Sequence, residues 1–172
     1  MNYKELLGKI KIYIFDVDGV FTDNTVWLTT DGEQMRTANV RDGYAVQLAV
    51  KCGYQIAVIS GGKSEAVRIR FEKLGVTEVN LGSANKKEVY EKLKAKWSFE
   101  DHDVCYMGDD IPDLPLLQRV ALSCCPADAA PEVKAASVYI SNKNGGEGCV
   151  RDILEQSLKL QGHWLKDEAL IW

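Results

Sequence analysis

Two aspartates one residue apart follow an apolar run near the start of the chain. Residues 10–15 lead directly into Asp16 and Asp18, and Gly19 comes next, within the stretch KIYIFDVDGVFTD. In extended backbone, residues two apart face the same way, so both carboxylates can address one ligand while the glycine lets the chain turn away. A buried carboxylate without a partner is costly, so we expect positive charge beside them.

Further polar residues stand at the ends of other patterned segments. Ser60 closes QIAVIS, Lys86 begins a helical pattern, and GDDIPD occupies residues 108–113. Asp110 is expected to cap the next helix, and Asp113 to orient a metal-bound water or Lys86. Crowded carboxylates need a hard cation, and with only two histidines in the chain, oxygen ligands favour Mg²⁺ over Zn²⁺. Magnesium in turn suggests a phosphate.

These residue types are the ones that phosphoryl transfer requires. The reaction needs a nucleophile, a proton donor for the leaving oxygen, and positive charge on the phosphoryl oxygens. Asp16 is the candidate nucleophile and Asp18 the candidate acid, while Lys86 and the Ser60 hydroxyl can hold the phosphate. Taken alone, the two aspartates also fit a turn, the serine a turn former, and the lysine a solvated helix start.

An alternation of strands and helices must position these residues. Strand-like apolar stretches are expected at 10–15, 55–60, 78–81, 104–107, 120–123 and 138–140. Helical patterns lie between them, at 43–52, 64–74, 86–96 and 114–119, with a short one after Pro131. This alternation predicts an α/β fold with a mostly parallel sheet and helices on both faces. Because ligands bind beyond the carboxyl ends of such strands, the polar residues above should share one rim.

Two connections depart from the alternation. Residues 25–39 alternate around TTDGE, and Asp-Gly is typical of tight hairpins. Asp42 is expected to cap the helix over 43–52, which Gly53 ends. The glycine-rich KNGGEG at 143–148 separates the core from a C-terminal segment, and is expected to start a mobile tail over about 143–172.

The composition of the chain limits the kinds of protein that it can be. With 172 residues, 46% of them apolar and 27% charged, the chain is expected to form a single domain over 1–172. The net charge of −4 argues against a nucleic-acid partner. No apolar run approaches the roughly 20 residues of a membrane span, and the N-terminus lacks the apolar core of a secretion signal, so we expect a cytoplasmic protein without a membrane partner.

Four motifs in order resemble those of the haloacid dehalogenase superfamily of phosphatases. They are FDVDGV at 15–20, the strand-ending Ser60, Lys86, and GDDxxD at 108–113. The resemblance implies that Asp16 forms an aspartyl-phosphate and that Asp18 is the general acid and base. It also implies that Mg²⁺ is held by Asp16, by the backbone carbonyl of Asp18, and by Asp109.

Over nearly the full chain, the sequence resembles the capless 3-deoxy-D-manno-octulosonate 8-phosphate phosphatases of that superfamily. The stretches that carry this resemblance are NVRDGYA, ISGGKSEAVRIR, GDDIPDLPLL and GGEGCVRD. It implies a Rossmann-like parallel sheet without a cap, with a β-hairpin inserted at about 24–40 after the first strand. It further implies a homotetramer with hairpins at its centre and active sites shared between subunits, serving lipopolysaccharide precursor synthesis.

The sequence departs from that family at the substrate end of the site. Gly62 stands where many members carry arginine, and Cys149 stands where alanine is usual. Arginine is the natural partner for the sugar carboxylate. The residues expected to bind the substrate are therefore Ser60, Gly61, Lys63, Arg68 and, from the tail, Arg151.

Other functions stay open on the sequence alone. A sister family hydrolyses nine-carbon sugar acid 9-phosphates, although NVRDGY is closer to the eight-carbon group. A receiver-like, non-enzymatic phosphoryl-binding module uses similar residues but lacks the second carboxylate at Asp18. A dehalogenase does not need that acid. A catalytically inactive tetramer would require the motif set to be vestigial.

Overall fold

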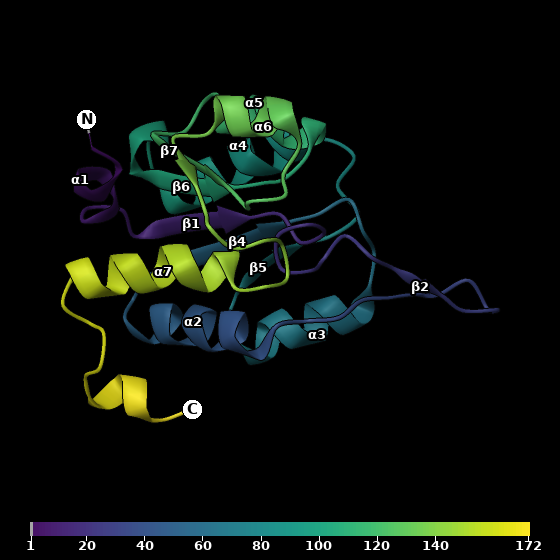
Figure 1. The fold of residues 1–172 in the computed structure, drawn as a ribbon, viewed down its shortest axis with the longest axis horizontal. Coiled ribbons are helices and arrows are strands. Elements are labelled where there is room, and N and C mark those ends of the chain that lie inside the picture. The colour runs from purple at the N-terminus through teal and green to yellow at the C-terminus, as the bar shows by residue number, and fades with distance from the viewer. Residues whose placement is uncertain (1) are drawn as a thin grey trace.

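The centre of the fold is one parallel sheet between two layers of helices (Figure 1). The computed structural model describes residues 2–172. Six strands pair in the order β5-β4-β1-β6-β7-β8, all parallel. Their bounds are β1 Ile12–Phe15, β4 Gln55–Ile59, β5 Glu78–Asn80, β6 Val104–Met107, β7 Leu122–Cys125 and β8 Tyr139–Ile140. The strand order reverses beside β1, and ligands bind at such a switch point.

Alternate residues of β1 serve the two faces of the sheet. Tyr13 and Phe15 join one core cluster, and Ile12 and Ile14 join the other. The helices on the first face are α1 Tyr3–Leu7, α2 Val40–Lys51, α3 Glu65–Lys73 and α7 Cys149–Leu160. Those on the second face are α4 Lys86–Trp97, α5 Leu114–Leu117 and α6 Pro131–Ala136. Three short 3-10 helices are η1 Asp101–Asp103, η2 Ile111–Asp113 and η3 Asp167–Leu170. The predicted α/β class is confirmed.

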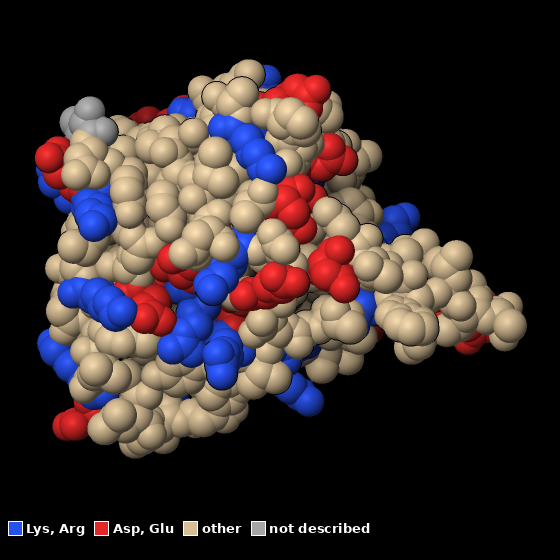
Figure 2. Space-filling view, viewed as in Figure 1, with Lys and Arg blue, Asp and Glu red and all other residues tan. Residues whose placement is uncertain are grey.

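A small antiparallel hairpin follows β1 and projects from the body (Figure 1). It consists of β2 Trp27–Leu28 and β3 Gln34–Met35, joined through Gly32 at φ +87°. In Figure 2 most of the surface of the projecting hairpin belongs to uncharged residues. Trp27, Leu28 and Met35 are 64%, 76% and 56% exposed, so the predicted hairpin carries an apolar surface that this chain does not cover.

Two expected boundaries are wrong. Helix α2 begins at Val40 because the Asn39 side chain accepts hydrogen bonds from the backbone N–H groups of Arg41 and Asp42, at 2.8 and 3.2 Å. Asn39, not Asp42, is therefore the cap. The strand expected at 120–123 lies at Leu122–Cys125, since Val120 still belongs to the turn that closes α5.

The C-terminal segment is not a mobile tail over its first half. Helix α7 packs beside α2 and buries Val150, Ile153, Leu154 and Leu158. The glycine-rich loop before it lies against the loop that follows β1: a Cβ on Gly145 would stand 2.0 Å from the carbonyl oxygen of Gly19. The glycines thus allow two backbones to meet, and they do not form a flexible linker. No helix within residues 2–172 is long and apolar enough to cross a membrane.

Asp42 joins α2 to the start of α7. Its carboxylate is fully buried, and Oδ1 accepts a hydrogen bond from the backbone N–H of Arg151 at 2.7 Å. Its other oxygen has no hydrogen-bond partner among the described residues. Burial raises the pKa of Asp42 to about 6, against the ordinary 3.8, although the hydrogen bonds from α7 and the nearby arginines oppose the shift.

We expect Asp42 to make stability depend on pH. Because its pKa is raised in the folded state, its contribution is complete below about pH 4 and is lost as the pH rises through about 6. Relative to Asp42→Asn, the wild-type protein should lose up to about 3 kcal/mol of unfolding free energy between pH 4 and 7.5. Urea unfolding of both proteins across this range measures the difference.

The matched control is Glu72→Gln, which neutralises an exposed carboxylate on α3. It should leave the pH dependence of the wild-type protein unchanged. Parallel curves for the wild type and Asp42→Asn would show that Asp42 does not bind a proton in this range.

Candidate active site

A polar cleft of about 570 Å³ opens at the carboxyl ends of the central strands. Residues from four segments line it: Asp16 and Asp18 after β1, Gly61 after β4, Lys86 at the start of α4, and Asp109 after β6. The sequence predicted that these segments share one rim, and the structure confirms it. Ser60 is buried at the edge of the cleft, where its Oγ accepts a hydrogen bond from the Gly62 N–H at 3.1 Å.

Lys86 forms the electrostatic centre of the cleft. Asn85 caps α4 and thereby places Lys86 as its first residue. The Lys86 Nζ lies 2.8 Å from Asp16 Oδ2 and 2.6 Å from Asp113 Oδ1, with only 10% of the side chain exposed. Burial by itself would lower the pKa of Lys86, but the two carboxylates outweigh it and raise the pKa. The ammonium is therefore charged between them.

Asp16 and Asp109 are buried carboxylates whose charge Lys86 does not fully balance. Burial, then the charge of Asp113, raises the pKa of Asp16 to about 7, against the opposing effect of Lys86. Burial likewise raises the pKa of Asp109 to about 6, although Asn24 donates a hydrogen bond to its Oδ2 at 2.7 Å. Two desolvated carboxylates that remain short of positive charge are a fitting donor pair for a hard divalent cation.

Asp113 completes a set of three carboxylates whose oxygens lie within 4.8 Å of one another, together with Asp16 and Asp109. Both of its oxygens are already occupied. Oδ1 accepts hydrogen bonds from Lys86 and from Tyr106, and Oδ2 accepts them from the backbone N–H groups of residues 109 and 110. These contacts favour Asp16 and Asp109 as metal ligands. They indicate that Asp113 positions Lys86 and the loop after β6.

Two neighbours of these residues fit the remaining expectations. The Asp110 side chain accepts a hydrogen bond from the Ile111 N–H at 2.8 Å and begins η2, as predicted for a cap. Gly19 has φ +80°, and a Cβ there would stand 1.9 Å from Asp109 Oδ2. Only glycine allows the chain to turn this close to the candidate ligand.

Asp18 is paired with a residue that the sequence did not single out. Arg36, at the end of β3, donates from Nε to Asp18 Oδ1 at 2.6 Å and from Nη2 to Asp18 Oδ2 at 3.0 Å. The Arg36 side chain is 7% exposed. Arg36 lies eighteen residues after Asp18, on the predicted hairpin, and nothing in the sequence indicates that the two side chains meet. The contact of Asn24 with Asp109 likewise has no signal in the sequence.

The predicted substrate-binding residues divide into two groups. Gly61 lines the cleft, and Lys63 lies next to it, with its stem over Gly82. Arg68 does not line the cleft; its Nη1 donates to the Val79 carbonyl at 3.0 Å. Within one chain, the structure therefore places Gly61 and Lys63 at or beside the cleft, and Arg68 away from it.

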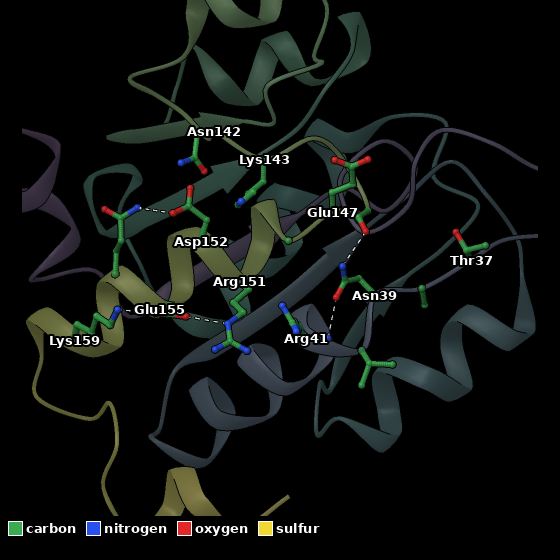
Figure 3. A pocket seen from close by; sticks show the side chains of 15 residues that line it. Thr37, Asn39, Arg41, Asn142, Lys143, Glu147, Arg151, Asp152, Glu155 and Lys159 are labelled. Carbon is green, nitrogen blue, oxygen red and sulfur yellow. Dashed lines mark hydrogen bonds and ion pairs between the residues drawn. The ribbon is translucent and has the colours of Figure 1, made fainter.

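Arg151 belongs to a separate groove that runs from the N-terminal end of α2 along one side of α7 (Figure 3). Its Nε donates to Glu155 Oε2 at 2.9 Å, and its guanidinium lies over the ring of Trp164. The groove carries both signs of charge, as the mixed colours at the centre of Figure 2 show. Arg151 does not line the cleft of its own chain, and its predicted contact with the substrate stays a prediction.

The carboxylate geometry predicts which aspartate binds metal. We expect Asp109→Asn to weaken Mg²⁺ binding by more than about 10-fold, because it removes a charged oxygen ligand. Asp110→Asn, which changes the adjacent capping carboxylate, should bind Mg²⁺ nearly as the wild type does. Titration calorimetry of the folded variants measures both affinities, and equal weakening in the two would place the ion elsewhere.

Comparison with known proteins agrees with this geometry. The family described as haloacid dehalogenase-like hydrolase matches residues 60–153. The chain is 35% identical over 153 residues to the 3-deoxy-D-manno-octulosonate 8-phosphate phosphatase KdsC of Escherichia coli K12, covering 89% of this chain and 81% of that protein.

Solved structures of such phosphatases share the fold. The enzyme from Yersinia pestis superposes with a TM-score of 0.90 at 31% identity, covering 93% of this chain and 86% of that one. The enzyme from Moraxella catarrhalis, in complex with magnesium ion, phosphate ion and a KDO molecule, gives a TM-score of 0.90 at 30% identity, covering 95% of each chain. The chain therefore belongs to the haloacid dehalogenase-like hydrolases and, within them, to the 3-deoxy-D-manno-octulosonate 8-phosphate phosphatase family.

Proposed function

We propose that this protein is a Mg²⁺-dependent phosphatase that hydrolyses 3-deoxy-D-manno-octulosonate 8-phosphate to the free sugar acid and phosphate. The observation that carries the proposal is the cleft in which Lys86 contacts Asp16 while Asp109 and Asp18 stand beside them. The Moraxella catarrhalis relative, whose structure holds magnesium, phosphate and KDO, supports the same substrate class.

Asp16 is the nucleophile in this scheme. The Val17 N–H donates to its Oδ1 at 2.7 Å, and Lys86 contacts its Oδ2, so the carboxylate is oriented from two sides. An oxygen of Asp16 forms a bond to phosphorus as the bond from phosphorus to the sugar oxygen breaks. Asp18 gives a proton to that leaving oxygen.

The second half of the reaction returns the enzyme to its starting state. Asp18, now a carboxylate, takes a proton from a water that attacks the phosphorus, and the bond to Asp16 breaks with release of phosphate. Lys86, fixed by Asp113, places positive charge beside the phosphoryl oxygens. When bound by Asp16, Asp109 and the Asp18 carbonyl, Mg²⁺ supplies further charge neutralisation. The Ser60 hydroxyl and Gly61 bind the phosphate group from the β4 side of the cleft.

The rival functions have weaker support. The curated relatives are named for the eight-carbon acid, so a nine-carbon sugar acid 9-phosphate is the comparison substrate in the assay. A receiver-like module is not favoured, because such a module lacks the second carboxylate, which here is that of Asp18 and lines the same cleft as Asp16. We also propose that the protein acts in the cytoplasm, in lipopolysaccharide precursor synthesis.

The assay that tests this function measures phosphate release from both sugar acids, with and without Mg²⁺. We expect Asp16→Asn and Asp18→Asn each to lower turnover by at least about 10³-fold, since each removes a group that the chemistry needs. The thermal unfolding curves should stay close to the wild-type curve, because Lys86 keeps Asp113 as a partner in Asp16→Asn, and in Asp18→Asn an amide oxygen can still accept a hydrogen bond from Arg36. Near wild-type activity in Asp16→Asn would rule out the aspartyl-phosphate.

We propose that four copies assemble through the hairpins and that neighbouring subunits help to close each site. The hairpin supports this proposal, because it exposes Trp27, Leu28 and Met35, and exposed apolar clusters of this kind mark contact surfaces.

Light scattering should give a mass about four times that of the 19.2 kDa chain. Leu28→Asp places a charge in the hairpin contact and should yield smaller species. Leu160→Asp, at an exposed leucine near the end of α7, is the control and should remain tetrameric. A wild-type monomer at micromolar concentration would contradict the shared-site arrangement.

A further inference from the structure

A second pocket opens beside the cleft, between the hairpin and the segment 61–64 that follows β4. It has a volume of about 350 Å³, and its walls include Arg36 and Lys63 as well as the hairpin turn. Gly61 and Gly62 line both this pocket and the cleft, so the two meet across these glycines. A ligand whose phosphate lies at Asp16 can therefore extend into a space lined by two cationic side chains, Arg36 and Lys63, and by one carboxylate, that of Glu33.

Arg36 takes its place there because residue 62 has no side chain. Its Nη2 lies 3.1 Å from the point where a Cβ on Gly62 would stand, and Asp18 Oδ2 lies 3.4 Å from that point. The Gln34 carbonyl accepts a hydrogen bond from Nη1 at 2.8 Å, which ties the guanidinium to β3. A larger residue at position 62 would compete with the guanidinium for this space.

We propose that Arg36 binds the carboxylate of the sugar acid in this pocket. The inference rests on the proposed function, which supplies a substrate with a phosphate at one end and a carboxylate at the other. The Nε and Nη2 atoms of Arg36 already hold a carboxylate, that of Asp18, in the two-point geometry that guanidinium groups favour. A substrate carboxylate can take the same two donors.

This exchange would link recognition to chemistry. While Arg36 is paired with Asp18, both carboxylate oxygens of Asp18 are engaged, and neither is free to approach the leaving oxygen. A substrate carboxylate that takes over Arg36 frees Asp18 for that task. A phosphate ester without a carboxylate leaves the pair intact and is turned over less well. Selectivity thus arises without a cap domain.

The other candidate arginines are committed elsewhere within the chain. Arg68 donates to a backbone carbonyl of β5, and Arg151 is paired with Glu155 in the separate groove. Lys63 adds a second positive charge to the pocket, but its single ammonium lacks the two-donor geometry. Arg36 is therefore the better fit for a planar carboxylate.

The test compares two substrates in two proteins. Values of kcat/KM are measured for the sugar acid 8-phosphate and for an analogue in which a primary alcohol replaces the carboxylate, with the wild type and with Arg36→Ala. We expect the preference for the acid to fall by about 10- to 100-fold, as for the loss of a charge-assisted hydrogen bond. Arg36→Gln, which keeps an uncharged polar partner for Asp18, repeats the test should the alanine variant fold poorly.

Equal losses on both substrates would overturn the inference, because Arg36 would then act only by positioning Asp18. A wild type that hydrolyses aryl phosphates but no phosphorylated sugar acid would instead refute the proposed function itself. Arg41→Ala removes an exposed arginine from the separate groove and should leave the preference unchanged. Restoration of the preference by Gly62→Arg in the Arg36→Ala background would show that a guanidinium at this place is what selects the acid.

Discussion

The ammonium of Lys86 lies between two buried carboxylates, and most of the site depends on that contact. Asp16 and Asp113 come from loops after β1 and β6, so the ion pairs join neighbouring strand ends to the start of α4. Removal of Lys86 would leave the buried carboxylates of Asp16 and Asp113 without a positive partner, a loss that costs about 3–5 kcal/mol when a buried ion pair is broken. The same ammonium that stabilises the resting site is placed to meet a phosphoryl group. In the proposed mechanism, the positive charge of Lys86 would therefore contribute both to the stability of the fold and to phosphate binding.

Asp113 shows how the fold keeps this lysine in place. Its carboxylate accepts hydrogen bonds from Tyr106 on β6 and from the backbone of its own loop. A carboxylate with every oxygen engaged is rigid, and a rigid partner fixes the ammonium more closely than a solvated one would. Asp109, held by Asn24, and Asp16 are left with raised pKa values and unmet charge. The site is thus arranged around a cation that the protein itself does not supply.

The sequence predicts those parts of the molecule in which a periodic pattern ends in a polar residue. The parallel sheet, the hairpin and the gathering of Asp16, Asp18, Lys86 and Asp109 at one rim follow from such patterns, and the structure confirms them. The roles of these residues remain proposals. The errors have a different origin: the glycines at 145 and 146 look like a linker in sequence, but they allow close backbone packing before a buried helix. A charged side chain alone does not reveal its partner, which is why Arg36 was missed.

The hairpin provides this capless domain with two features, an exposed apolar surface and an arginine at the active-site cleft. Its two strands expose Trp27, Leu28 and Met35, and Arg36 follows Met35 directly and reaches the active-site cleft. Because β3 carries Met35 and the Gln34 carbonyl that accepts from Arg36, packing of the apolar strand residues against another subunit would fix the backbone that carries the arginine. Assembly would then reduce the conformational freedom that Arg36 loses on binding a substrate. If the proposed assembly and the proposed role of Arg36 both hold, the oligomer would do the work of a cap domain, because it would order the residue that binds the far end of the sugar.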